Sequence, residues 1–411
     1  MAPTDDRAKG TPDAESTGLD GFDISPAWRF ERNEHWRYFT RLRREDPVHF
    51  CPDSPYGSYW SVTRYDDIVA VECDYRRFSS EGNVIIGDIP PEFDRTRAFA
   101  TSDPPVHTCE RKAVTPAVSP KRLAALEDCI RTGIAGVLDG LPRGETFNWV
   151  DRVSVELTTQ MVARLFDFPF EERRLLPHWC EVLVTTPQQD MTPERREIID
   201  AYRDRILDLW RRRAAQPGDD VISALAHCPE TASMIDDPWH LIGTVTLVAG
   251  ANEAARGALS GGVVAFHQFP DEWRKLRADP SLVRGAVPEI VRWQSPILHM
   301  RRTTTEDVEV GGKRLPKGSR VVMWFCSGNR DEAHFEDGDA LRIGRPNAHR
   351  HLGYGFGIHR CLGSHVADMQ LRILWQEILK RFARIELMAE PKRLASNFSA
   401  NYDEVLVRIP A

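Results

Sequence analysis

The stretch His351-Leu352-Gly353-Tyr354-Gly355-Phe356-Gly357-Ile358-His359-Arg360-Cys361-Leu362-Gly363 decides the fold of this 411-residue chain. Three glycines alternate with other residues ahead of one cysteine. Glycine lets a backbone turn tightly and approach a flat, bulky group without a clash at Cβ. An apolar run from Val366 to Leu379 follows and predicts a helix. A cysteine at the beginning of a helix lies where free N–H groups and the helix dipole stabilise a thiolate.

A thiolate held in this way is the expected proximal ligand of heme iron. The alternative is that Cys361 packs as a small apolar residue ahead of a helix, as most lone cysteines do. The spacing of an aromatic residue, Gly357, His359, Cys361 and Gly363 resembles the heme-binding loop of the cytochrome P-450 superfamily. One position departs from that loop: its first aromatic residue is usually Phe, and here it is Tyr354, whose hydroxyl needs a partner if it is buried.

The resemblance implies a mainly α fold with a minor β part, in which heme b (iron protoporphyrin IX) lies between a long distal helix and the helix after the cysteine loop. Cys361 would be the ligand of the iron, and Tyr354, Gly357 and Gly363 would belong to the heme-binding loop.

The composition is that of an ordinary soluble protein, with 41% hydrophobic and 28% charged residues. The 54 basic residues are mixed with 61 acidic ones and the net charge is −7, which argues against nucleic acid as a partner. The sequence contains no run of 18 apolar residues, so it predicts no membrane anchor. The eight cysteines are scattered and no signal peptide is evident, so we expect a reducing cytoplasm.

Residues 1–20 show no periodicity and predict a disordered tail, which leaves 21–411 as a single domain. Apolar periodicity predicts helices over residues 28–44, 121–138, 151–167, 193–213, 219–227, 236–268 and 284–294, and a short helix that begins at Asp66-Asp67. Alternating patterns predict strands over 48–50 and 59–63, and a small sheet within 303–325 that turns at Gly311-Gly312.

Residues 79–105 read as a long loop with apolar positions at 84–86, Ile89, Phe93 and Phe99. Such a loop in a compact enzyme is more often a lid or a pocket wall than a plain connection. The alternative is a loop that simply packs on the core.

Glu289 and Arg292 stand three residues apart on one face of a predicted helix. Taken alone, such a pair is usually solvated and contributes little. Together with Arg345, it resembles the buried Glu-Arg-Arg triad of the superfamily, which would fix the segment that leads to the Cys361 loop.

Heme carries two propionates, which basic side chains must neutralise. His107 and Arg111 lie one helical turn apart, Arg302 opens a strand, and His359 stands two residues before the cysteine. Each alone could be a surface residue. The resemblance implies that all four bind the propionates.

The distal helix would contain Val248-Ala249-Gly250-Ala251-Asn252-Glu253-Ala254-Ala255-Arg256. In the superfamily this stretch reads small-Gly-x-acid-Thr, and the acid and the threonine hydroxyl support proton delivery. Here Glu253 supplies the acid, Asn252 precedes it, and Ala254 stands where the threonine is expected. No Ser or Thr occurs between Val248 and Leu259, so a shift of register cannot restore the hydroxyl.

From about residue 45 onward the chain resembles the soluble bacterial alkane terminal hydroxylases, for example at Tyr59–Ile68, His299–Thr303 and Leu374–Leu379. The resemblance implies an apolar substrate pocket. Each of its members could equally be a core residue. The predicted pocket residues are Val84, Ile85, Ile86, Val245, Val248, Ala249, Ile297, Leu298, Met300 and Phe398.

We therefore expect a heme-thiolate monooxygenase that hydroxylates an unactivated C–H bond of a hydrophobic small molecule, such as an alkane or a terpenoid. Electrons would come from NAD(P)H through a ferredoxin reductase and a ferredoxin. One alternative is a biosynthetic tailoring or peroxide-using oxidase, in which the substrate or water replaces the missing hydroxyl. A non-enzymatic heme-binding protein is the less favoured alternative.

Overall fold

The computed structural model describes residues 17–20, 22–88, 97–176, 178–179, 182, 192–250 and 252–411. Most of the predicted tail, and Ile89 and Phe93 of the predicted pocket loop, lie outside these residues.

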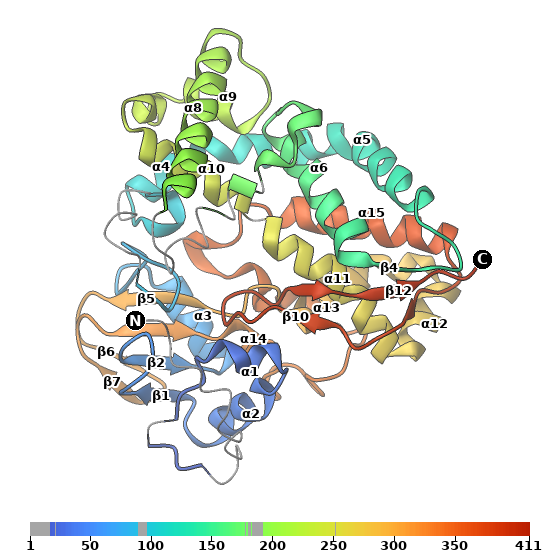
Figure 1. Ribbon diagram of the computed structural model, residues 1–411. Coiled ribbons are helices and arrows are strands. Elements are labelled where there is room, and N and C mark those ends of the chain that lie inside the picture. The colour runs from blue at the N-terminus through green and yellow to red at the C-terminus, as the bar shows by residue number, and fades with distance from the viewer. Residues whose placement is uncertain are drawn as a thin grey trace.

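Most of the longer helices lie in the upper and right-hand parts of Figure 1, while the main sheet lies at the lower left, next to the N-terminal helices. The prediction of a mainly α fold with a minor β part is confirmed. The helices are α1 Ala27–Glu31, α2 His35–Glu45, α3 Tyr65–Cys73, α4 Val106–Val114, α5 Pro120–Asp139, α6 Glu156–Leu165, α8 Pro193–Ala215, α9 Val221–His227, α10 Pro238–Gly250, α11 Asn252–Gln268, α12 Pro270–Ala278, α13 Val283–Gln294, α14 Phe325–Gly328 and α15 Ser364–Arg381.

The main sheet has five strands in the order β1-β2-β8-β5-β3. Strands β2 and β8 are parallel, and the other neighbours are antiparallel. A small three-stranded sheet has the order β4-β12-β9, and two-stranded sheets pair β6 with β7 and β10 with β11. The strands are β1 Val48–Cys51, β2 Tyr59–Val62, β3 Phe78–Ser79, β4 Thr146–Asn148, β5 Met300–Thr304, β6 Val308–Val310, β7 Lys313–Leu315, β8 Arg320–Met323, β9 Glu386–Leu387, β10 Lys392–Arg393, β11 Tyr402–Glu404 and β12 Leu406–Arg408.

Two predicted helices differ from the structure. The helix over 28–44 is two helices, because Asn33 adopts a left-handed conformation with φ 58° between α1 and α2. The helix over 151–167 begins as a π-helical turn, Val150–Val155, before α6. The long helix over 236–268 is described as α10 and α11, with residue 251 outside the described residues.

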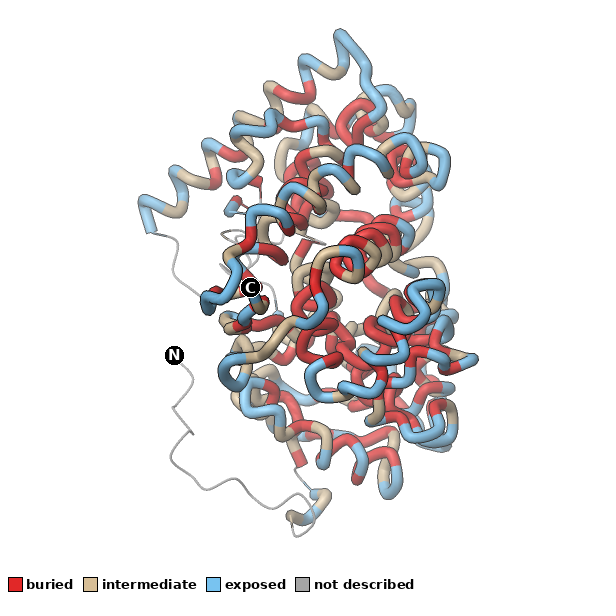
Figure 2. The backbone as a smooth tube through the Cα atoms, turned by 90° about the vertical axis from the view of Figure 1, so that its right-hand side faces the viewer, coloured by how far each residue is buried: buried red, intermediate tan, exposed pale blue. Residues whose placement is uncertain are grey.

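Helix α11 contacts α6, α12, α13 and α15 and lies in the interior, where buried backbone concentrates in Figure 2. Close packing there depends on small residues. A Cβ on Gly262 would lie 2.6 Å from Cζ2 of Trp375 on α15, which would force the two helices apart.

The glycines of the cysteine loop pack against protein. Gly355 and Gly357 have φ values of 63° and 64°, which L side chains rarely adopt. A Cβ on Gly355 would lie 2.8 Å from Oε2 of Glu72, at the end of α3, and one on Gly357 would overlap the Glu72 carbonyl oxygen. The close neighbour of these two glycines on the side where a Cβ would stand is therefore α3.

His299 joins three segments that lie far apart in the sequence. Its Nδ1 lies 2.8 Å from the carbonyl oxygen of Asn397, and its Nε2 lies 3.0 Å from the backbone nitrogen of Ile86. The backbone N–H of Ile86 can donate only to an unprotonated Nε2, so Nδ1 carries the proton and the ring is neutral. Burial lowers the pKa of His299 to about 4.

Gly357→Ala should destabilise the protein more than Gly312→Ala. Gly312 also has a positive φ, 76°, but a Cβ there meets nothing within 4 Å. We expect a loss of about 1–2 kcal/mol in unfolding free energy for Gly312→Ala, from backbone strain alone. Overlap with Glu72 should raise the loss for Gly357→Ala to about 2–4 kcal/mol. Denaturant unfolding measures both variants, and equal losses would contradict the close packing on α3.

His299 should make the protein less stable in acid. The folded pKa of about 4 lies below the ordinary value of 6.5, so the unfolded chain binds more protons between these values and stability falls as the pH falls through this window. From pH 7.5 to pH 5, the wild type should lose about 2 kcal/mol more unfolding free energy than His299→Gln. Denaturant unfolding at the two pH values measures this, and equal losses would show that His299 is not held neutral.

Candidate heme site

Cys361 lies between a short 3-10 turn, Gly357–His359, and helix α15. Its backbone N–H donates to the carbonyl oxygen of Tyr354 at 2.7 Å, which closes the loop. Burial raises the pKa of the Cys361 thiol, while the Gly363 N–H and the nearby Arg111 and Arg360 act in the opposite direction. Desolvation thus opposes the stabilisation of a thiolate that the helix start favours. The positive charge of a bound metal would deprotonate such a thiol.

The hydroxyl of Tyr354 has the partner that its burial requires. It donates to Oδ1 of Asp368, on α15, at 2.7 Å. Burial raises the pKa of Asp368, and the hydrogen bond from Tyr354 acts against this rise. The replacement of the usual Phe by Tyr thus ties the loop to the first half of α15.

The four residues predicted to bind propionates lie together. The rings of His107 and His359 are 4.3 Å apart between centroids, and Arg111 donates to the carbonyl oxygen of Arg360 at 2.5 Å. Burial, followed by the charges of Arg302, His107 and Arg111, lowers the pKa of His359 to about 2. Burial and Arg111 also lower the pKa of His107.

Three buried nitrogen atoms of this cluster have no hydrogen-bond partner among the described residues: Nδ1 and Nε2 of His107, and Nε2 of His359. Buried polar atoms without partners are unfavourable. Beside arginines, they suit an anionic group with several acceptor oxygens. The residues present therefore fit the propionates of a heme.

Arg302 has a partner that the sequence did not indicate. Its Nη2 forms an ion pair with Oε1 of Glu72 at 2.6 Å, and both side chains are buried. Oε2 of Glu72 accepts a hydrogen bond from the backbone of Phe356 at 3.1 Å. Part of the charge of Arg302 is thus neutralised within the protein, while Arg302 stays close enough to His359 to lower its pKa.

Glu289, Arg292 and Arg345 form a buried cluster. The carboxylate of Glu289 accepts hydrogen bonds from Arg292 Nε at 2.7 Å and Arg345 Nε at 3.0 Å. The remaining N–H groups of Arg292 donate to the carbonyl oxygens of Asn329, Gly338 and Ala340. The cluster therefore fixes the irregular segment between α14 and the cysteine loop.

On the predicted distal side, Asn252 and Glu253 begin the described part of α11. Both amide atoms of Asn252 are buried without a partner among the described residues. Glu253 is 42% exposed at its side chain, and its Oε2 accepts from Nδ2 of Asn401 at 3.3 Å. Ala254 is half-buried and carries no hydroxyl. Asn401, in the C-terminal segment, gave no signal in the sequence that would connect it to Glu253.

Three predicted pocket segments lie side by side. The N–H of Arg301 donates to the carbonyl oxygen of Val84, and that of Leu298 donates to the carbonyl oxygen of Phe398, each at 2.8 Å. Four of the predicted residues are fully buried in hydrophobic clusters: Ile86, Val245, Ala249 and Leu298. The others are half-buried and have surface left for a ligand: Val84, Ile85, Val248, Ile297, Met300 and Phe398.

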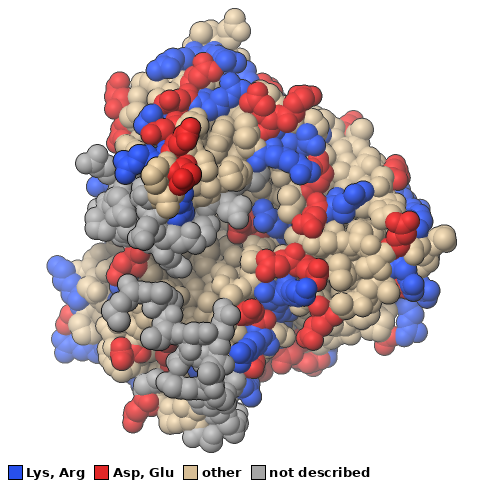
Figure 3. Space-filling view, viewed as in Figure 1, with Lys and Arg blue, Asp and Glu red and all other residues tan. Residues whose placement is uncertain are grey.

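The surface gives no sign of a charged partner on the face that Figure 3 shows. Basic and acidic side chains of the described residues are interleaved there without a continuous basic patch. No helix in the described part of the chain is both long and apolar enough to cross a membrane.

The chain is similar to proteins of one family. The cytochrome P450 family model matches residues 264–401. The linalool 8-monooxygenase of Pseudomonas putida is 36% identical over 379 residues, which cover 88% of this chain and 92% of that protein.

Two solved structures have the same fold. Cytochrome P450-153 from Novosphingobium aromaticivorans superposes with a TM-score of 0.88 at 36% identity and covers 94% of this chain and 99% of its own. CYP153D17 from Sphingomonas sp. PAMC 26605 gives a TM-score of 0.87 at 37% identity and covers 96% and 100%. The chain therefore belongs to the cytochrome P450 family and is a monooxygenase that acts on hydrophobic substrates.

Proposed function

We propose that the protein hydroxylates an unactivated C–H bond of an apolar small molecule, an alkane or a terpenoid, with O2 and electrons from NAD(P)H. One observation carries the proposal: the Cys361 loop lies beside a cluster of arginines and neutral imidazoles, and the buried nitrogens of these imidazoles have no hydrogen-bond partner among the described residues. Residues 21–411 would form the single domain that surrounds the cofactor.

Cys361 would hold the iron of heme b, and His107, Arg111, Arg302 and His359 would hold its propionates. When bound, the heme supplies the activation of O2, and the protein supplies orientation and the control of protons. The neutral rings of His107 and His359 can each donate one hydrogen bond to a carboxylate. Gly357 and Gly363 would allow the cysteine loop its tight path.

Protons on the distal side would pass through Glu253. Its carboxylate is partly exposed and is held by Asn401, so it can exchange a proton with water and present it toward Asn252. The amide atoms of Asn252 have no partner in the part of the chain that the structure describes, and they can hold an ordered water molecule or a polar group of the substrate. This would replace the hydroxyl that Ala254 lacks.

The apolar character of the predicted pocket supports a hydrocarbon substrate. Its half-buried members Val84, Ile85, Ile297, Met300 and Phe398 come from segments that hydrogen bonds hold together. The similarity to a linalool 8-monooxygenase and to P450-153 structures also favours a terpenoid or an alkane.

A ferredoxin and its reductase would deliver the electrons, and the enzyme would work in the cytoplasm. The described part of the chain contains seven cysteines without a disulfide, as in a reducing compartment. The resemblance to the soluble bacterial alkane hydroxylases supports a ferredoxin as the donor.

Ala254 and the unpartnered Asn252 also favour a second candidate, a tailoring or peroxide-using oxidase. In this case the substrate would bring its own hydroxyl to the position of the missing threonine. Turnover with hydrogen peroxide in place of NADH and ferredoxin would distinguish this candidate.

Product formed per NADH consumed tests the proposed function. With a reconstituted ferredoxin system and a medium-chain n-alkane, the wild type should form the terminal alcohol. Ala254→Thr should raise product per NADH about twofold or more if the missing hydroxyl limits proton delivery. Ala255→Thr, the neighbouring position on α11, is the matched control.

Consumption of NADH with peroxide as the main product would contradict the alkane assignment. An unchanged ratio in Ala254→Thr would show that Glu253, Asn252 or water already supplies the proton fully.

A further inference from the structure

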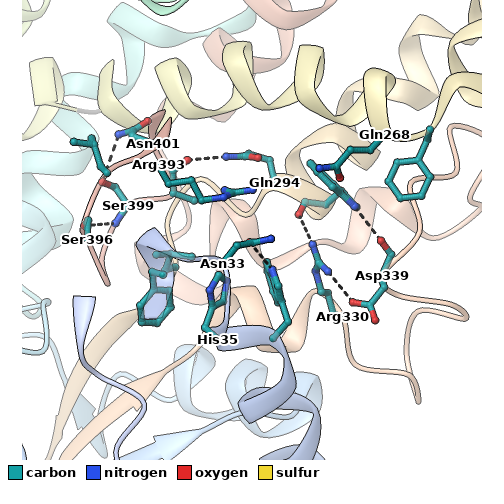
Figure 4. A pocket seen from close by; sticks show the side chains of 17 residues that line it. Asn33, His35, Gln268, Gln294, Arg330, Asp339, Arg393, Ser396, Ser399 and Asn401 are labelled. Carbon is teal, nitrogen blue, oxygen red and sulfur yellow. Dashed lines mark hydrogen bonds and ion pairs between the residues drawn. The ribbon is translucent and has the colours of Figure 1, made fainter. Parts of the chain in front are cut away.

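A polar cavity of about 130 Å³ lies between the N-terminal helices α1 and α2 and the C-terminal segment (Figure 4). Its exposed mouth includes Asn33 and Gln268, and its buried wall includes His35 and Asn401. None of its lining residues belongs to the cysteine loop or to the predicted propionate cluster. Of the predicted substrate pocket, it shares Leu298 alone.

His35 is the polar group in this wall that most needs a partner. His35 is 3% exposed, and neither of its ring nitrogens has a hydrogen-bond partner among the described residues. The ring is held between Phe30 and Trp36, with centroids 4.5 Å and 4.2 Å away. The carbonyl oxygen of Arg29 lies near the ring and favours the protonated form of His35, but its geometry is not that of a hydrogen bond. A ligand in the cavity would satisfy a nitrogen that the protein leaves unpaired.

Two arginines line the cavity, and an acidic residue neutralises the charge of one of them. Arg330 forms an ion pair with Asp339 at 2.7 Å, and its guanidinium lies 3.4 Å from the ring centroid of Trp36. Arg393 lies over the ring of Tyr402 at 4.8 Å and has no acidic partner in the part of the chain that the structure describes. Figure 4 shows Arg393 reaching in from the C-terminal segment, opposite His35 and Asn33.

The cavity therefore carries one net positive charge. Arg330 and Asp339 cancel, and Arg393 remains. Burial and the charges of Arg393 and Arg330 lower the pKa of His35, so the imidazole is neutral and donates one hydrogen bond. The N-terminus of α2 adds to the positive electrostatic potential of the cavity. His35 and Trp36 at this end line the cavity, and no side chain of the described residues caps the helix.

We propose that this cavity is a binding site for a compact monocarboxylate, separate from the heme site. A guanidinium matches a carboxylate in a planar, two-bond arrangement, and the neutral His35 supplies a further donor. A single negative charge balances Arg393, whereas a dianion would leave one charge uncompensated in a partly buried site. The proposal does not depend on which hydrocarbon the enzyme oxidises.

Acetate is the probe that tests the site. Calorimetric titration of the heme-loaded enzyme should give saturable binding with one site. Arg393→Gln should weaken it at least about tenfold, because it removes the charge that the anion balances. His35→Phe should weaken it less, because it removes one donor and no charge. Arg211→Gln is the matched control, since Arg211 is an exposed arginine of α8 without an ion pair among the described residues.

The Soret band of the heme should not change during the titration, since acetate would bind away from the iron. Equal affinity in Arg393→Gln, His35→Phe and Arg211→Gln would overturn the proposal, as would the absence of saturable binding to the wild type. Saturable binding of inorganic phosphate without binding of acetate would overturn the assignment to monocarboxylates. A shift of the Soret band in step with binding would place acetate at the iron and contradict a separate site.

Discussion

The buried carboxylate of Glu72 is the contact on which the position of the cysteine loop depends. One of its oxygens pairs with Arg302 on β5, and the other accepts the backbone N–H of Phe356 in the loop. The loop can approach this closely only because Gly355 and Gly357 have no Cβ. A buried carboxylate without these partners would be strongly unfavourable, so helix, strand and loop are held as one unit. Cys361 and His359 take their places from this unit.

The sequence predicted most of this architecture where the signal is local. Helical periodicity and turn residues located the main elements, and the spacing around Cys361 and Glu289 identified the loop and the buried cluster. The break between α1 and α2 at Asn33 was not predicted, because a residue in the left-handed conformation leaves no pattern inside an apolar periodic stretch. The contact of the loop glycines with α3 was not predicted, because Glu72 and Gly357 lie far apart in the sequence.

Several long-range polar contacts could not be read from the sequence. The sequence assigned no role to Glu72, His299 or Asn401, and each acts on a partner from a distant segment. His299 aligns three segments of the predicted pocket through backbone groups that every residue possesses. Asn401 lies in the wall of the cavity that contains His35, and it donates a hydrogen bond from the C-terminal segment to Glu253. The folded structure thus shows a partner for Glu253 that the sequence did not indicate.

The reduced carbon monoxide complex tests the central claim, that the loop held by Glu72 presents Cys361 as the ligand of the iron. The wild type should show the spectrum of a thiolate-bound heme, and Cys361→Ser should lose it. Cys73→Ser should keep it, although Cys73 is an exposed cysteine that touches the same loop at Gly357. An unchanged thiolate spectrum in Cys361→Ser would contradict the account.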